Sequence, residues 1–567
     1  MSELAAGERR PIVRQRLGRD ELLMRGALVG LAAILVLMIA APLYAIMKKA
    51  VEDKDGGFVG LENFRRFLEN PSLAHSVQHS LVAALATTVL TVTLASAYAY
   101  GLRRSCMRWK GLFRAVALIP LLAPSLLQAI ALVYLFGRQG WMKGILFGQD
   151  IYGPIGIVVG EVFYCFPHAL IILMAALSIA DARLYEAAGA LRASPLRTFF
   201  TVTLPGAKYG LSSAGFVVFT LVITDFGIPK VIGGWYNVLA TDIYKQVIGQ
   251  QNFQMGSVVS LVLLLPAVVA FFADRAMQRR QTALLTARAV PYEPKPEPMR
   301  DWLLFGFCAL WGLFTLAMLG TAAFASFVKF WPYNLELVWK HYDFDLAGGG
   351  GWGAYRHSIE LGLWVAAIGT GLIFAGAYLV EKTKGAPRLS SFVHMLAMLP
   401  MAVPGLVLGL AYIFFFNDPA NPLGFIYRSM AILVLCTVAH YYTVAHLTAV
   451  TALKQLDHEF EAVSSSLKVP FYTTFWRVTV PVCMPAILDI SIYLFINAMT
   501  TVSAVVFLYG PNTALASVAV LNMDDAGDEA PAAAMAMMIV YTAAAVRLAH
   551  WAATRGLQRA SEAWRTR

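Results

Sequence analysis

Polar side chains stand at two matching places near the ends of apolar runs, where they suit the passage of a charged solute. The run 209–229 ends in Thr224-Asp225-Phe226-Gly227, and Lys230 follows it directly. The run 482–508 carries an amide and two hydroxyls at the corresponding place. Polar groups inside long apolar segments are costly, so they often mark a path for solutes. A carboxylate and an ammonium facing hydroxyls suit a zwitterion, and the expected path residues are Thr224, Asp225, Lys230, Asn497, Thr500 and Thr501.

A second interpretation of these charges stays open. Asp225 and Lys230 also fit an interfacial pair whose charged ends reach water. For the other polar residues inside apolar runs we expect hydrogen-bonded packing; these are Glu161, His168, His440 and His446.

Signatures of catalysis are missing from the sequence. The dipeptide Gly-Lys does not occur, so the chain has no G-x-x-x-x-G-K-[ST] loop to cradle a nucleotide. The five cysteines have no metal-site spacing and are expected to be small buried hydrophobes. We therefore expect no enzyme, no metal and no cofactor bound by this chain.

Composition indicates a protein that crosses a membrane many times. Of 567 residues, 58% are hydrophobic and 14% charged, with a mean hydropathy of +0.63. About 20 apolar residues are needed for one helical crossing. Twelve runs reach that length, which predicts an all-α polytopic fold; they lie near 26–47, 79–101, 112–136, 152–179, 209–229, 257–274, 301–326, 358–380, 392–416, 425–449, 482–508 and 531–551.

Charge predicts the orientation. The formal net charge is +11, and basic residues gather in the tail 1–25, the loop 102–114, the segment 275–300 and the C-terminus. With twelve spans these fall on one side, which should be the cytosol, together with both termini. The acidic loop 522–529 lies on the opposite side. It is expected to be either a solvated loop or a docking surface for a periplasmic partner.

The chain repeats itself. TFFTVTLP at 198–205 aligns with TFWRVTVP at 474–481, and Pro120 and Pro124 align with Pro400 and Pro404. Six spans in each half make the repeat parallel. The predicted organisation is a cytosolic basic tail at 1–25, a first half at 26–279, a Pro-rich cytosolic linker at 280–299 and a second half at 300–567.

A polar, helix-favouring island lies between two spans of the first half. It reads EAAGALRASPLRTFFTVTLP over 186–205, and Ser194-Pro195 interrupts its helical pattern. It resembles the EAA loop of permease subunits of binding-protein-dependent ABC importers, with Arg192 at the usual glycine position. Since arginine rarely adopts a left-handed conformation, we do not expect such a turn there. The resemblance implies contact with an ATPase subunit through Glu186, Ala187, Ala188, Leu191, Arg192, Ala193 and Ser194.

The second half carries a degraded copy after its own fourth span. It reads EAVSSSLKVPFYTTFWRVTVP over 461–481. The implied ATPase contacts are Glu461, Ala462, Leu467 and Lys468. Two loops imply two ATPase subunits, which would bind the ATP and Mg.

The resemblance extends over nearly the whole chain and implies a fused, two-domain permease with a type I ABC importer fold in a bacterial inner membrane. It implies a periplasmic substrate-binding protein as a partner, and no nucleic acid. Long stretches such as TDFGIPKVIGGWYNVLATDIYKQVIGQQNF at 224–253 look most like the 2-aminoethylphosphonate branch. Ferric iron and thiamine permeases remain alternatives, ferric iron favouring carboxylate and tyrosinate oxygens. An ion-coupled secondary transporter is the rival class, but it has no partner for the EAA loops.

Overall fold

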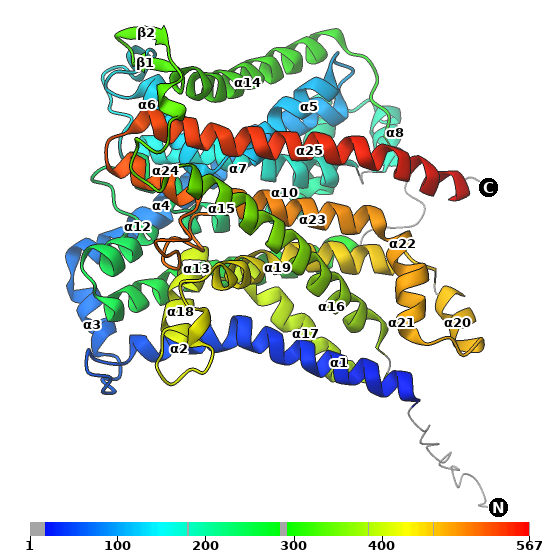
Figure 1. Ribbon diagram of the computed structural model, residues 1–567. Helices are drawn as coiled ribbons and strands as arrows, with labels where there is room; N and C mark the ends of the chain where they lie inside the picture. Colours follow the sequence, from blue (N-terminus) through cyan, green and yellow to red (C-terminus); the bar gives the residue numbers. More distant parts are fainter. Residues whose placement is uncertain (1–17, 179–180, 284–291, 384, 458, 566–567) are drawn as a thin grey trace, which may run out of the picture.

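The computed structural model describes residues 18–178, 181–283, 292–383, 385–457 and 459–565. In these residues the chain forms a bundle of long helices that run side by side (Figure 1). A small antiparallel hairpin of β1 (Val328–Phe330) and β2 (Asn334–Leu337) lies at one end. The apolar pattern did not predict this hairpin, because it lies between two apolar runs.

The described residues contain nine helices long and apolar enough to cross a membrane, or twelve crossings if each of three bent pairs counts as one. Counted this way, the crossings follow the twelve predicted runs in order. In the first half they are α1–η1–α2 (Arg19–Ala50), α4 (Pro71–Arg104), α5–η2–α6 (Lys110–Phe136), α7 (Pro154–Ser178), α9–η4–α10 (Pro195–Thr224) and α13 (Phe253–Ala283). In the second half they are α14 (Pro298–Ala325), α15–η7–α16 (Gly351–Lys382), α17–η8–α18 (Pro387–Phe416), α19 (Met430–Lys454), α21–η10–α22–α23 (Phe471–Thr500) and α25 (Glu529–Arg565).

Short helices connect the crossings. They are α3 (Glu62–Glu69), η3 (Lys143–Leu146), α8 (Ala182–Ala190), α11 (Gly227–Ile232), α12 (Leu239–Tyr244), η5 (Lys245–Gly249), η6 (Lys340–Tyr342), η9 (Gly424–Ile426), α20 (Glu459–Ser466) and α24 (Ala516–Asp525).

The prolines that align the two halves stand where the third crossing of each half is broken. The pair α5–η2 and α6 meets at 106°, and the pair α17–η8 and α18 at 114°. Pro124 and Pro404 cap the second helix of each pair, because a proline disfavours helix in the residue before it. Pro167 makes no such break, since α7 runs unbroken through it.

The first crossing of each half packs against the other half. α1 and α2 contact α16, α17 and α18, and the Tyr412 hydroxyl donates to the Met38 carbonyl oxygen over 2.8 Å. In return α14 contacts α4, α5 and α6, with Phe163 stacked on Trp311 at 4.9 Å. The division into halves at 26–279 and 300–567 therefore follows chain order, whereas in space the two halves exchange their first helices.

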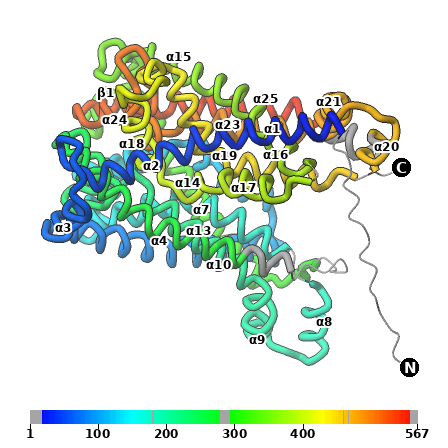
Figure 2. Tube along the Cα trace, turned by 90° about the horizontal axis from the view of Figure 1, so that it is seen from below, coloured from blue at the N-terminus to red at the C-terminus, as the bar shows by residue number. Residues whose placement is uncertain are grey.

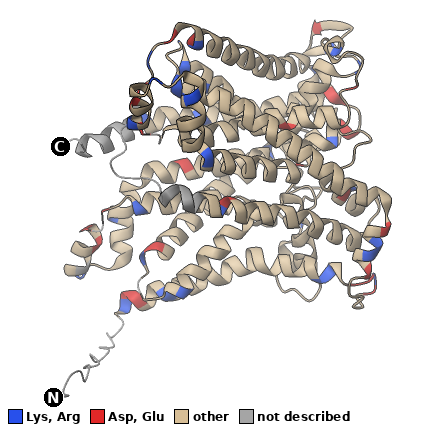
Figure 3. Cartoon of the chain, turned by 180° about the vertical axis from the view of Figure 1, so that it is seen from behind, with Lys and Arg blue, Asp and Glu red and all other residues tan. Residues whose placement is uncertain are grey.

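Charged residues concentrate at the two ends of the bundle (Figure 3). One end carries α8, α20 and the end of α25, and Figure 2 shows α8 and α9 projecting from it. The opposite end carries the β hairpin and α3. Most of the predicted tail 1–25 and the part of the predicted linker at 284–291 lie outside the described residues.

Candidate functional site: a central cavity between the two halves

A cavity of about 380 Å³ lies between the two halves. Its walls come from α7 and α19, from the ends of α10 and α23, and from the breaks before α6 and α18. Two side chains of α13, Phe271 and Asp274, complete the lining. Each half therefore supplies the same three elements. The polar lining residues are Ser125, Tyr164, His168, Thr220, Thr224, Asp225, Asp274, His440, Tyr441, Tyr493, Asn497, Thr500, Thr501 and Ser503.

A serine–glycine contact closes each side of the cavity at the helix breaks. A Cβ on Gly227 would stand 2.3 Å from the Ser125 hydroxyl oxygen, and a Cβ on Gly405 would stand 2.3 Å from that of Ser503. The two contacts occupy matching places, but the serine and the glycine are exchanged between the halves. A larger residue at either glycine would push the broken third crossing away from the fifth.

Asp225 is the carboxylate that the first half brings to the cavity. It follows α10, and its Oδ2 accepts the Ile228 N–H over 2.9 Å at the start of α11. Ser125 and the fully buried Glu161 lie beside it.

Five of the six expected path residues line this cavity: Thr224, Asp225, Asn497, Thr500 and Thr501. Lys230 does not; its Nζ lies 2.7 Å from Asp525 Oδ1 and 5.3 Å from the Tyr244 ring centre. The expected Asp225–Lys230 pair is therefore replaced by a bridge between the halves, from α11 to α24.

Nine of the fourteen polar lining residues were not expected on the path, and Tyr164, Tyr441, Tyr493 and Asp274 are among them. The tyrosines lie in apolar runs, where they read as core aromatics. Asp274 stands at the edge of a basic segment, and the Ser213 hydroxyl donates to it over 2.6 Å. His168 and His440, which were expected to be packing residues, also reach the cavity.

Matching hydrogen bonds hold the loops at the end of the bundle that carries the β hairpin and α3. The amide N–H at the start of α12 donates to the Ser80 hydroxyl, and that at the start of α24 donates to the Ser358 hydroxyl, both over 2.8 Å. The residue before each serine is a histidine: His79 bonds to the Asn237 carbonyl at 3.0 Å, and His357 bonds to the Ala514 carbonyl at 3.1 Å. This agreement in geometry supports the internal repeat.

The acidic loop 522–529 contains a carboxyl group, that of Asp524, whose pKa is raised. Burial, followed by the nearby Asp525 and Glu529, raises the pKa of Asp524 to about 7, although Lys230 acts in the opposite direction. Ionisation of Asp524 thus opposes folding. The folded protein is therefore more stable when Asp524 is protonated. This contribution to stability is fully present at low pH and is lost as the pH rises through about 7.

We expect Asp524→Asn to flatten this pH dependence. Thermal unfolding of the purified protein in nanodiscs should show a wild-type melting temperature that falls between pH 5 and pH 8, with a smaller fall in the variant. Asp528→Asn, at an exposed position four residues on, is the control and should behave as wild type. An identical slope in Asp524→Asn and wild type would contradict the assignment.

The first EAA loop (186–205) folds as a helix, a turn and a second helix that continues into the membrane. α8 begins at Ala182 after the Asp181 N-cap, so Glu186 lies in the second turn and does not cap the helix. The segment from Pro195 runs on through α10, so the second part of the loop is not a separate cytosolic helix.

The prediction that arginine removes the left-handed turn is wrong. Arg192 has φ 53°, and Lys468 has φ 54° at the matching place in the second EAA-like loop (461–481). In each loop the next amide N–H turns back to the helix, from Ala193 to the Ala188 carbonyl and from Val469 to the Ser464 carbonyl, both over 3.0 Å. These hydrogen bonds cap the C-terminal end of the helix and stabilise the left-handed conformation, which glycine adopts with less strain.

The tip of the first EAA loop exposes leucines. Leu191 is 82% exposed and Leu196 73%, and Leu184, just before the loop, is 56% exposed. Glu186 and Ala187 are exposed beside them, whereas Ala188 is buried. A polar loop with an exposed apolar tip is typical of a surface that a protein partner covers.

The second EAA-like loop is tied to one membrane helix of each half. Lys382, at the end of α16, pairs with Glu461 in α20 at 2.5 Å. The Asp20 carboxylate, near the start of α1, accepts the Phe471 N–H over 3.1 Å. Leu467 is 70% exposed and stands where Leu191 stands in the first loop.

Two six-crossing repeats around a shared polar cavity, with a surface loop on each repeat, define a membrane transport permease. A family model described as "Binding-protein-dependent transport system inner membrane component" matches residues 92–283 and 367–558. These two matches cover more than half of the chain, so the chain belongs to that family. Both matches begin after the first crossing of their half, the helix that packs across the bundle.

Three relatives illustrate the range of similarity. The chain is 26% identical over 547 residues to a ferric transport system permease protein, FbpB, of Actinobacillus pleuropneumoniae, covering 92% of this chain and 77% of the relative. It is 24% identical over 518 residues to the Fe(3+)-transport system permease protein FbpB 2 of Haemophilus influenzae, covering 89% and 95%. A 2-aminoethylphosphonate transport system permease protein, PhnU, of Salmonella choleraesuis is 26% identical over 249 residues, covering 42% and 87%.

These similarities confirm the type I ABC importer permease fold and the multi-pass inner-membrane location. The relatives are transport permeases and not enzymes. Membership of the family also implies an ATPase and a periplasmic binding protein as partners.

Proposed function

We propose that this permease carries ferric iron, held by oxygen ligands, through the central cavity. The observation that carries the proposal is the set of donors around the cavity: two carboxylates, three phenols and several hydroxyls. Hard, highly charged cations favour anionic oxygen donors. The relatives that span most of the chain are named for ferric transport, which supports the same cargo.

A small phosphonate is the second candidate cargo. The PhnU relative favours it, although this similarity extends over less than half of the chain. The helices α6 and α18 also begin at the cavity behind prolines that make no side-chain cap, and helix N-termini favour anions. Either solute needs a polar path to cross the membrane, since charged groups meet a large desolvation cost in lipid.

Five residues are proposed as the path: Thr224, Asp225, Asn497, Thr500 and Thr501. Asp225 supplies the charge, and the four neutral groups pass the cargo without holding it tightly. Lys230, whose ammonium pairs with Asp525, is proposed to act on the outer rim by joining the two halves.

Two ATPase subunits are proposed to dock at the EAA loops, one on each. The first would bind around Glu186, Ala187 and Leu191, and the second around Ala462 and Leu467. ATP and Mg would bind to those subunits. Closure of the ATPase pair would move both loops. The motion would reach the cavity ends through α10, which is continuous with the first loop, and through α23, which follows the second loop after a bend of 77°.

The proposed orientation places both termini, the 280–299 linker and the EAA loops in the cytosol. Reporter fusions at Pro294 and Asp525 should then report opposite sides, because six crossings separate the linker from the C-terminus and five separate it from Asp525. The measurement is the ratio of a cytosol-active to a periplasm-active reporter at each site. Finding both sites on one side would contradict the twelve-crossing count.

Uptake in a deletion strain tests the cargo. Cells lacking the gene should lose accumulation of radiolabelled ferric iron and recover it with a plasmid copy, while 2-aminoethylphosphonate uptake stays at the wild-type rate. The reverse pattern would transfer the cargo assignment to the phosphonate.

A further inference from the structure

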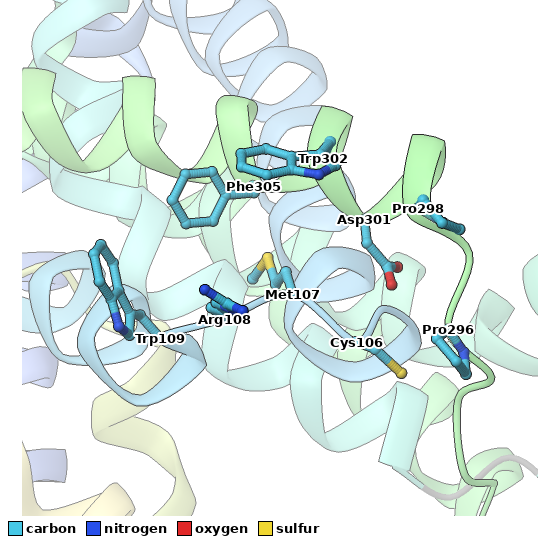
Figure 4. Close-up of a pocket in the computed structure, with 9 residues that line it drawn as sticks. All are labelled: Cys106, Met107, Arg108, Trp109, Pro296, Pro298, Asp301, Trp302 and Phe305. Carbon is cyan, nitrogen blue, oxygen red and sulfur yellow. The ribbon is translucent and has the colours of Figure 1, made fainter.

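A pocket separate from the transport cavity lies at the end of the bundle that carries the EAA loops. It has a volume of about 440 Å³ and lies between the 105–109 loop after α4 and the first two turns of α14 (Figure 4). Its lining residues are Cys106, Met107, Arg108, Trp109, Pro296, Pro298, Asp301, Trp302 and Phe305. Because α14 is a membrane crossing, its first turns lie at the level of the lipid headgroups.

The pocket carries one cation without a protein partner. Arg108 is exposed, and the described part of the chain gives it no ion pair or hydrogen bond. Asp301, the acidic lining residue, is already engaged by the Arg300 guanidinium at 3.1 Å and by the N–H groups of Glu297 and Cys106. The charge left for a ligand is therefore positive, and Arg103 and Lys110 lie near it in sequence.

Aromatic side chains frame this cation. Figure 4 shows Arg108 between Trp109 and Met107, with Trp302 and Phe305 along the opposite wall. Trp109 and Trp302 are 66% and 72% exposed. Trp109 also has φ 59°, a left-handed conformation that bulky residues rarely adopt and that is found at ligand clamps.

The surface next to the pocket is apolar and faces outward. Leu112 on α5 is 57% exposed, and Leu303 on α14 is 65% exposed. A soluble anion would leave this surface uncovered, whereas acyl chains would cover it. Exposed tryptophans at the end of a crossing are typical of the headgroup layer.

We propose that this pocket binds an anionic phospholipid of the inner leaflet. The lipid phosphate pairs with Arg108, the glycerol region lies between Trp109 and Trp302, and the acyl chains follow the exposed leucines of α5 and α14. The bound lipid joins the 105–109 loop to the start of the second half, next to the linker residues Pro296 and Pro298.

Native mass spectrometry of the full chain released from nanodiscs tests this proposal. In an equimolar mixture of phosphatidylglycerol and phosphatidylcholine, the wild type should retain the anionic lipid in preference. Arg108→Ala should lower that preference by about fivefold, the equivalent of about 1 kcal/mol per basic residue near an anionic surface. Arg114→Ala, an exposed arginine on α5 outside the pocket, is the matched control and should keep the wild-type preference.

Three outcomes would overturn the proposal. Equal losses in Arg108→Ala and Arg114→Ala would indicate general surface charge. Displacement of the lipid by millimolar glycerol 3-phosphate would make the ligand a soluble phosphate. Unchanged preference in Arg108→Ala and in Arg108→Gln would exclude the site, provided that both variants unfold at the wild-type temperature in phosphatidylcholine nanodiscs.

Discussion

Leu191→Asp should abolish ATP-driven uptake while the protein still inserts into the membrane. Leu191 is 82% exposed at the tip of the first EAA loop, so the substitution costs the isolated permease little. In the docked state it would bury a carboxylate in an apolar contact. Loss of a central interface side chain costs about 2 kcal/mol or more, which weakens binding by about thirtyfold. Co-purification of the ATPase with the permease, and uptake in cells, measure the two effects.

Leu467→Asp is the matched variant in the second EAA-like loop. It should reduce uptake less, because this loop is a degraded copy that the Lys382–Glu461 pair also ties to its own helices. Ala188, although it belongs to the EAA pattern, is a poor test, because it is buried within the loop and a larger residue would disturb the loop itself. Normal uptake and normal ATPase retention in Leu191→Asp would exclude this loop as the docking site.

Asp225→Asn should lower uptake of ferric iron by about tenfold, the equivalent of about 1.4 kcal/mol in the transport barrier. The amide keeps the shape and can still accept the Ile228 N–H, which caps α11. It removes the carboxylate that Asp225 offers to a cation. Initial uptake rates, normalised to the amount of permease in the membrane, measure the effect.

Thr501→Val is the control, because Thr501 occupies the place of Asp225 in the second half and lines the same cavity. It removes a hydroxyl but no charge, so its effect should be less than about threefold, within the range of a single neutral hydrogen bond. If both variants transport iron at the wild-type rate, Asp225 has no part in the path.

The sequence predicted the parts of the fold that depend on apolar length and on repetition. Each crossing needs a long apolar run, and the aligned Pro124 and Pro404 mark the break in the third crossing of each half, so the sequence predicted the order of the helices and their alignment. The same reasoning found Thr224, Asp225, Asn497, Thr500 and Thr501, because polar groups are conspicuous in apolar runs.

Features that depend on packing between distant segments were not readable. Tyr164, Tyr441 and Tyr493 face the cavity only because α7, α19 and α23 turn those faces inward, and amphipathic aromatics suit a core equally well. The packing of α1 and α14 against the opposite half produces no periodic pattern in the sequence, so it could not be predicted. The left-handed Arg192 was missed because residue preference opposes it, while a bond between Ala193 and Ala188 that only the folded loop provides holds it in place.

Transport by reconstituted proteoliposomes tests the central claim most directly. The permease, its ATPase and its periplasmic binding protein would be combined, with ATP supplied on the side of the EAA loops and radiolabelled ferric iron on the other. We predict accumulation that requires ATP, the binding protein and an intact Leu191. Accumulation driven by an ion gradient in the absence of ATP and of the binding protein would contradict the account and would make this chain a secondary transporter.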